Sequence, residues 1–150
     1  MSLLSFQRFL RYAWASPATL VGLACATIAV AFGATLRTVD GTVECAGSGI
    51  ARVARILPGS YRFVAITFGH VILGIDHRLL AEVRCHEHVH VRQYEKWGPL
   101  FVPLYLGSSL VQFVRGRDPY RHNCFEREAW AVEQLASRLH AEQNEPDRLA

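Results

Sequence analysis

The residues best suited to chemistry lie in one short segment, Cys85-His86-Glu87-His88-Val89-His90, which contains the pattern H-E-x-x-H. On a helix, His86 and His90 are one turn apart, so both imidazoles project from the same face and can bind one Zn²⁺. Glu87 adjoins the first histidine, where it can take a proton from a zinc-activated water. The motif predicts a zinc site with two histidine ligands and Glu87 as the catalytic base.

A third ligand is expected on a later helix, in the run Phe125-Glu126-Arg127-Glu128-Ala129-Trp130-Ala131. Glu128 shares a helical face with three apolar residues, Val132, Leu135 and Leu139. It should therefore point toward the core, where a carboxylate is costly unless something pairs with it. We expect Glu128 to be the zinc ligand, with Glu126, on a more polar side of the helix, as the alternative. If no metal is bound, the alternative interpretation is that Glu128 forms a salt bridge with Arg92 or Arg121.

Three further residues are candidates for supporting roles. Gln93 follows His90 by three residues and should lie near the same helical face, where it can hold a ligand in place. Tyr120 and His122 lie in the loop before the last helix, and either side chain can donate a hydrogen bond to a developing oxyanion. His88 lies two residues from each histidine of the motif and should face another way.

The motif requires a helix, and the surrounding residues supply its boundaries. Asp76 is a good N-cap, apolar residues recur at helical spacing over 78–95, and Gly98-Pro99 ends the run. Upstream, the range 62–74 is rich in β-branched and aromatic residues and holds Gly69-His70 at its middle. It predicts two strands joined by a tight turn, or one strand with a bulge.

The region between 38 and 57 shows shorter signals of regular structure. Asp40-Gly41 is typical of a turn, and residues 42–45 are expected to form a strand. Residues 49–57 carry apolar side chains at helical spacing and predict a short helix. Together with the range 62–74, this region should form a small sheet.

Residues 12–36 contain no charged side chain and are bracketed by Arg11 and Arg37. At 1.5 Å per residue the segment is long enough to cross a hydrocarbon core of about 30 Å. Tyr12 and Trp14 lie where an interfacial aromatic belt is expected, which favours a retained anchor. A cleavable signal sequence and a buried core helix are the alternatives.

A second uncharged stretch, residues 97–114, is interrupted by glycines and prolines. It could dip into a bilayer or pack on the anchor, and a bent apolar core helix is the other interpretation. A polar loop over 115–124 should follow, then a last helix over 125–143 and a polar tail over 144–150.

Length and composition limit the alternatives. The 150 residues suffice for one compact domain, and half of them are hydrophobic. The net charge is only +3 and the arginines form no basic stripe, so nucleic acid is not expected as a partner. The four cysteines show no C-x-x-C spacing and do not indicate a disulfide framework. In an oxidising compartment, one disulfide among Cys45, Cys85 and Cys124 is still compatible with the sequence.

The runs HEHVHVRQYEKWGPLFVPLYL and YRHNCFEREAWA resemble the H-E-x-x-H-x-x-Q segment of small bacterial zincin-like proteins, similar in plan to minimal gluzincin metallopeptidases. The resemblance covers about residues 67–139. It implies a glutamate ligand on a later helix, best matched by Glu128, and an edge strand that holds an extended substrate over the metal. Members of that group often carry Asp and Pro where this chain has His122 and Cys124, which bears on the loop and not on the ligands.

These observations predict an α+β chain with three parts: an N-terminal membrane anchor over 1–37, a zincin-like domain over 38–143 and a polar tail over 144–150. In the domain, a small sheet should pack on the H-E-x-x-H helix and on a later glutamate-bearing helix. The leading hypothesis is a zinc metallopeptidase in the bacterial inner membrane, with its domain outside the cytoplasm. A non-enzymatic membrane protein with a structural or vestigial metal site and a zinc hydrolase of a non-peptide substrate are the alternatives.

Overall fold

The chain adopts an α+β fold in a computed structural model that describes residues 3–56 and 63–143. The polar tail expected over 144–150 and position 57 of the short predicted helix lie outside these ranges. A mixed four-stranded sheet has the order β1-β2-β4-β3, from strands β1 (Ala34–Val39), β2 (Thr42–Gly47), β3 (Ala65–Phe68) and β4 (Val71–Gly74). The helices are α1 (Leu3–Ala31), α2 (Ser48–Ile56), α3 (His77–Trp97), the 3₁₀ turn η2 (Gly98–Leu100), α4 (Phe101–Val114) and α5 (Cys124–Gln143).

Two tight turns set the register of the sheet. Asp40 and Gly41 have positive φ angles of 47° and 81°, the backbone that a two-residue hairpin turn requires, and β1 pairs antiparallel with β2 around them. Gly69, with φ of 59°, begins the turn that joins β3 to β4. The described part of the range 62–74 therefore holds two strands, β3 and β4, and not one bulged strand. β2 and β4 pair in parallel and bring the two hairpins into one sheet.

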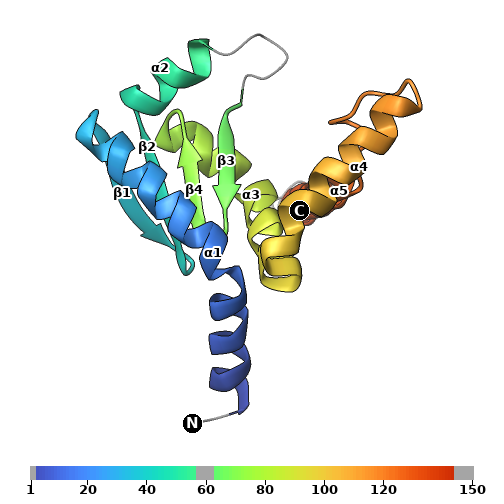
Figure 1. The fold of residues 1–150 in the computed structure, drawn as a ribbon, viewed down its shortest axis with the longest axis horizontal. Coiled ribbons are helices and arrows are strands. Elements are labelled where there is room, and N and C mark those ends of the chain that lie inside the picture. Colours follow the sequence, from blue (N-terminus) through green and yellow to red (C-terminus); the bar gives the residue numbers. More distant parts are fainter. Residues whose placement is uncertain (1–2, 57–62, 144–150) are drawn as a thin grey trace, which may run out of the picture.

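Helices cover both faces of this sheet, with α1 on one side and α3 on the other (Figure 1). Side chains alternate between the faces along each strand. Val71 and Leu73 of β4 pack in the cluster that includes α1, whereas Ile72 between them packs with Leu80 of α3. Because all four residues of β4 are buried, this strand is the centre of the packed unit.

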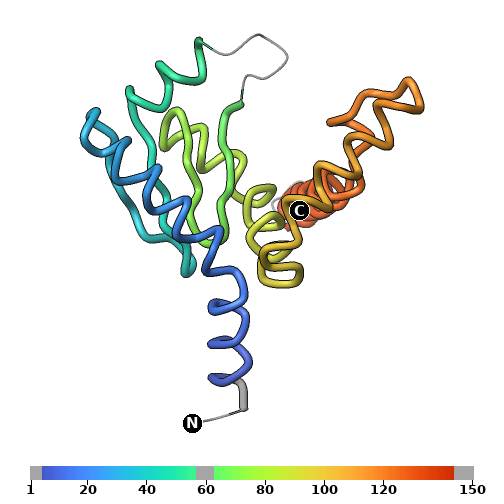
Figure 2. Tube along the Cα trace, in the orientation of Figure 1, coloured from blue at the N-terminus to red at the C-terminus, as the bar shows by residue number. Residues whose placement is uncertain are grey.

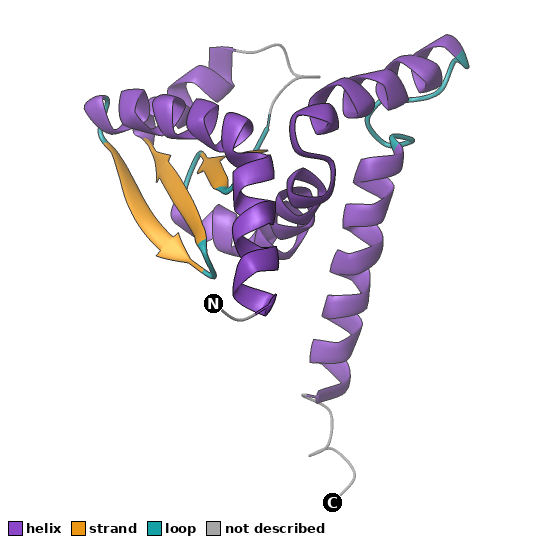
Figure 3. Cartoon of the chain, turned by 60° about the horizontal axis from the view of Figure 1, so that its bottom comes forward, coloured by secondary structure: helices purple, strands orange, loops and turns teal. Residues whose placement is uncertain are grey.

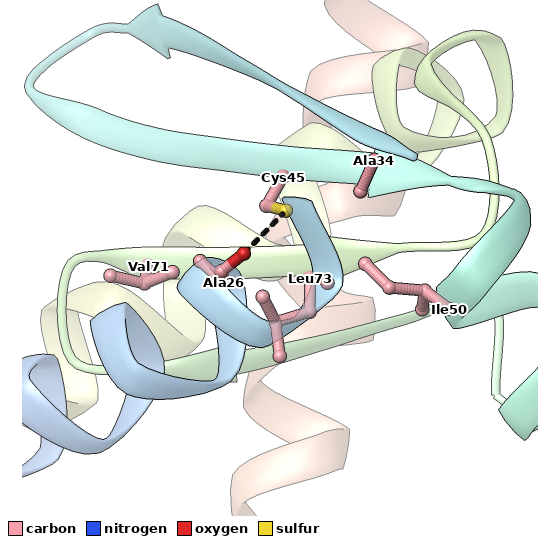
Figure 4. Packing of buried hydrophobic residues seen from close by; sticks show 7 residues of the cluster. Ala26, Ala34, Cys45, Ile50, Val71 and Leu73 are labelled. Carbon is pink, nitrogen blue, oxygen red and sulfur yellow. Dashed lines mark hydrogen bonds between the residues drawn. The ribbon is translucent and has the colours of Figure 1, made fainter. Parts of the chain in front are cut away.

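The helix α1 packs on the sheet through its small residues. Ala26 and Ala29 belong to the core cluster with Cys45 and Val71, and the Cys45 thiol approaches the Ala26 carbonyl oxygen at 3.9 Å (Figure 4). Pro17 lies inside α1, which bends along its length as a proline predicts (Figure 2). The N-terminal helix is therefore one layer of the same packed unit as the sheet.

The close approach of α1 to β4 predicts a cost for any added side-chain atom at Gly22. A Cβ there would lie 2.7 Å from the Val71 Cβ, whereas a Cβ on Gly107 of α4 would meet nothing within 4 Å. We expect Gly22→Ala to lower the free energy of unfolding by about 1–3 kcal/mol and Gly107→Ala to leave it unchanged or raised. Thermal denaturation of the detergent-purified variants measures this, and an unchanged midpoint for Gly22→Ala contradicts the packing of α1 on the sheet.

By length and composition, residues Ser5–Ala31 qualify as a membrane span or a signal sequence, with a mean hydropathy of 1.6. The stretch His77–Val114 also qualifies, at 1.2, but α3 carries charged residues along its length, so the apolar part is 97–114. The outward side of α1 exposes large apolar side chains, among them Phe9, Trp14, Leu20 and Ile28. Exposed apolar surface of this kind marks a site of contact with lipid or with another protein.

The segment after α3 runs through η2 into α4 and returns as α5, away from the sheet (Figure 3). The interruptions at Gly98-Pro99 produce the η2 turn, and Pro103 and Gly107 are accommodated inside α4. Only Phe101 of α4 is buried. The interpretation of 97–114 as an apolar core helix is therefore wrong, because most of its side chains are exposed in the described chain.

All four cysteines are free, so none of the pairs left open by the sequence forms. Burial raises the pKa of the Cys45 thiol, which is fully buried between the sheet and α1, whereas Cys124 is exposed. Because the thiolate is the reactive form, iodoacetamide should label Cys124 rapidly in the native protein and Cys45 only after denaturation. Peptide mapping by mass spectrometry measures the two rates. Equal native labelling would mean that α1 leaves the sheet.

Candidate metal centre

The two histidines of the motif point their Nε2 atoms at each other across one turn of α3. The distance between His86 Nε2 and His90 Nε2 is 3.2 Å, and both residues are buried. The helix that carries them begins where the sequence predicted, because the Asp76 carboxylate accepts a hydrogen bond from the Arg78 amide at 2.7 Å. Two buried imidazole nitrogens are thus held side by side.

The carboxylate that joins them is Glu126, from the first turn of α5. Its Oε2 lies 3.2 Å from His86 Nε2 and its Oε1 lies 3.5 Å from His90 Nε2. A tetrahedral zinc site with bonds of about 2.0–2.1 Å separates its ligand atoms by about 3.3–3.4 Å. The three side chains could therefore hold a metal ion without rearrangement, and one ligand atom from each lies within 4.8 Å of the others.

The burial and charge of Glu126 suit it to be a metal ligand. Glu126 is 3% exposed, and its Oε2 has no hydrogen-bond partner among the described residues, although His86 Nε2 is near. Burial acts to raise the pKa of Glu126, but the contacts with His86 and Tyr105 outweigh it and hold that pKa below its ordinary value. A buried, charged carboxylate whose two oxygens each face an imidazole nitrogen is well suited to bind a cation.

The remaining nitrogen of each histidine has an oxygen neighbour. Gln93 Oε1 lies 2.8 Å from His90 Nδ1, and Glu133 Oε2 lies 3.3 Å from His86 Nδ1. Partners of this kind fix the ring orientation and leave Nε2 free for a metal. Gln93 therefore lies where its spacing predicted. Glu133 was not among the predicted site residues, although it follows Glu126 by two helical turns and lies on the same face.

Glu128, the ligand favoured from the sequence, lies elsewhere. Its side chain is exposed, and its Oε2 accepts a hydrogen bond at 2.9 Å from Gln93 Nε2 rather than from an arginine. The apolar face that it was expected to share is not buried, since Leu135 and Leu139 are 58% and 49% exposed. Only the start of α5 reaches the core, through Phe125, Glu126 and Ala129. The structure thus brings Glu126, and not Glu128, to the histidines.

Glu87 lies beside the histidines and opposite the edge of the sheet. Its Oε2 accepts a hydrogen bond at 2.7 Å from the hydroxyl of Thr67 on β3, and both residues are 7% exposed. Burial raises the pKa of Glu87, and the Thr67 hydrogen bond opposes that shift without cancelling it. A raised pKa makes the carboxylate a stronger base toward a proton of a neighbouring water. No local pattern in the sequence indicated Thr67 as its partner.

The two loop residues proposed for an oxyanion have different positions. The ring of Tyr120 packs against Trp130, with ring centres 5.5 Å apart, and Trp130 in turn lies 6.3 Å from the His86 ring. His122 is exposed, and its Nδ1 lies 3.3 Å from a carbonyl oxygen of its own loop. Tyr120 therefore lies at the rim of the site and His122 does not reach it.

The other histidines contact different parts of the fold. His88 approaches the Thr42 hydroxyl of β2 at 3.5 Å, on the side of α3 that faces the sheet. His70 stacks on Tyr12 of α1 with ring centres 3.9 Å apart and lies 3.2 Å from Glu95. His77 lies 2.9 Å from Thr35. Among the described residues, the group that could hold a metal ion is His86, His90 and Glu126, and it includes neither His88 nor Cys124.

Comparison with protein-family models, with curated proteins and with solved structures finds no match to this chain. The metal centre is therefore inferred from the residues themselves: two histidines and an adjacent buried glutamate on α3, and a buried carboxylate on α5.

Proposed function

We propose that the chain is a membrane-associated zinc hydrolase with a zincin-like core that cleaves peptide bonds. The observation that carries this proposal is the group formed by His86, His90 and Glu126, with Glu87 beside it and no fourth protein ligand within the described residues. Structural zinc sites fill four positions with protein ligands, whereas catalytic sites use three and keep one open. The donor set therefore supports catalysis more than a purely structural role.

Zinc is the metal that these donors suit best. Two imidazoles and one carboxylate in tetrahedral spacing are a common catalytic zinc set, and hard cations such as Mg²⁺ prefer oxygen ligands. Bound zinc supplies Lewis acidity toward water and toward a substrate carbonyl oxygen. His86 and His90 would hold it through Nε2, and Glu126 through the unpaired Oε2.

Glu87 is suited to move the proton that hydrolysis requires. Its carboxylate can accept a proton from the attacking water and return it to the leaving nitrogen of the cleaved peptide bond. The Thr67 hydroxyl donates to Oε2 and so orients the carboxylate. Burial removes competing water and keeps the proton in the site.

The position of β3 supports an extended peptide as the substrate. β3 is at one end of the strand order and pairs with β4 along one side only. An extended peptide can add to such an edge through backbone hydrogen bonds. Because Thr67 is a β3 residue that contacts Glu87, a peptide paired with β3 would pass close to the base.

Membrane association is supported by the outward apolar side of α1 and by the exposed residues of α4, such as Leu106 and Phe113. Because α1 also packs on the sheet, the helix would hold the metal centre at a fixed position relative to the bilayer. Substrates would then be peptide segments that reach the membrane surface.

Zinc content and peptide cleavage test this proposal together. We expect the detergent-purified chain to hold about one zinc per molecule by elemental analysis, to cut members of an unbiased peptide library identified by mass spectrometry, and to lose cleavage when a chelator removes the zinc. Bound zinc without cleavage of any peptide would favour the structural site or a non-peptide substrate. Absence of zinc under metal-replete conditions would overturn the proposal.

A further inference from the structure

The geometry points to Tyr105 of α4 as the residue that positions Glu126 for the metal, an inference that rests on the proposed zinc site. The Tyr105 hydroxyl donates a hydrogen bond to Glu126 Oε1 at 2.6 Å. This is a short bond between a hydroxyl and a charged acceptor, which is the stronger class of hydrogen bond in proteins.

The two oxygens of Glu126 have different surroundings. Oε1 is satisfied by Tyr105, whereas Oε2 has no hydrogen-bond partner among the described residues and lies 3.2 Å from His86 Nε2. A carboxylate held at one oxygen cannot rotate freely about its terminal torsion. Tyr105 therefore fixes the carboxylate with Oε2 beside His86 Nε2, and it favours Oε2 as the ligand atom.

The position of Tyr105 depends on Asn123, which precedes α5 and is fully buried. Its Nδ2 donates to the Tyr105 carbonyl oxygen at 3.0 Å and to the Ser109 hydroxyl at 2.7 Å, and its Oδ1 accepts from the Phe125 amide at 2.9 Å. One side chain thus caps α5 and ties it to α4. This fixes the spacing between the helices that carry Tyr105 and Glu126.

A buried tyrosine can also serve only to fill the core, and Tyr94 provides the comparison. Tyr94 packs in the same aromatic cluster, against Phe101, and is 3% exposed. The hydrogen bond to Glu126 belongs to Tyr105 and not to Tyr94. Removing either hydroxyl leaves the ring and the packing in place, but only one removal frees the carboxylate.

The test is zinc affinity, measured by competition with a chromophoric chelator, for wild type, Tyr105→Phe and Tyr94→Phe. We expect Tyr105→Phe to raise the zinc dissociation constant about 10- to 100-fold, as the loss of a partner that orients a ligand does, and Tyr94→Phe to leave it unchanged. Thermal denaturation of the metal-free proteins confirms that both variants fold.

The outcomes test the positioning role of Tyr105 separately from the zinc site itself. Wild-type affinity in Tyr105→Phe overturns the positioning role while the zinc site stands. Equal weakening in both variants assigns the effect to packing and also overturns that role. If the wild-type chain binds no zinc, the proposed function fails and the role of Tyr105 fails with it.

Discussion

Glu87→Gln should lower the rate of peptide cleavage by about 10²- to 10⁴-fold, the usual contribution of a positioned general base, while the chain keeps its zinc. Glutamine fills the same space and can still meet Thr67, but it cannot take a proton from water. The ligand atoms belong to other residues, so the metal should stay. Initial rates on the best peptide from the library and elemental analysis of the same sample measure the two effects.

Glu82→Gln is the matched control, because Glu82 is an exposed residue of the same helix and the change in charge is identical. It should cleave like the wild type. If Glu87→Gln retained full activity with zinc bound, Glu87 would not be the base. If Glu87→Gln lost its zinc, the carboxylate would be needed to bind or retain the metal, and the rate could not be assigned to proton transfer.

Glu126→Ala should weaken zinc binding by more than about 100-fold, whereas Glu128→Ala should change it far less. Loss of a group that only orients a ligand already costs 10- to 100-fold, so the loss of the ligand itself should cost more. Glu126 contributes the orphaned oxygen at the histidines, and Glu128 reaches the site only through Gln93. Dissociation constants from chelator competition compare the two variants directly.

The two variants show which glutamate of α5 is the metal ligand, because the residues are two positions apart on the same helix and the substitution is identical. Loss of zinc in Glu128→Ala with retention in Glu126→Ala would restore the ligand expected from the sequence. It would also mean that α5 rotates about its axis when zinc binds. If both variants kept their zinc, the two histidines would bind the metal without either carboxylate.

The sequence alone was sufficient for the elements whose signals are local. The N-cap at Asp76 and the hairpin turn at Asp40-Gly41 depend on the conformations open to a few adjacent residues, whereas at Gly69 the sequence left a turn and a bulge open. The pairing of His86 with His90 follows from the pitch of a helix. Periodicity and turn chemistry relate residues that are close together in the chain, so the sequence alone can reveal them.

The third ligand depended on where α5 meets α3, which no local pattern contains. The sequence favoured Glu128 on the assumption that the most apolar face of a helix is the buried one. In the structure only the start of α5 is packed, so Leu135 and Leu139 stay exposed and the buried face is the one that holds Glu126. When a helix contacts the core along only part of its length, its most apolar face over the whole length need not be the buried face.

What the sequence by itself determined is the helix that carries the histidine pair and the glutamate between them. The tertiary structure decided which carboxylate completes the group, that Thr67 and Tyr105 hold the two glutamates, and that α1 packs as a layer on the sheet. The physical reason is that each of these contacts joins segments far apart in the chain. Their choice depends on how whole helices and strands pack and not on the propensities of the residues themselves.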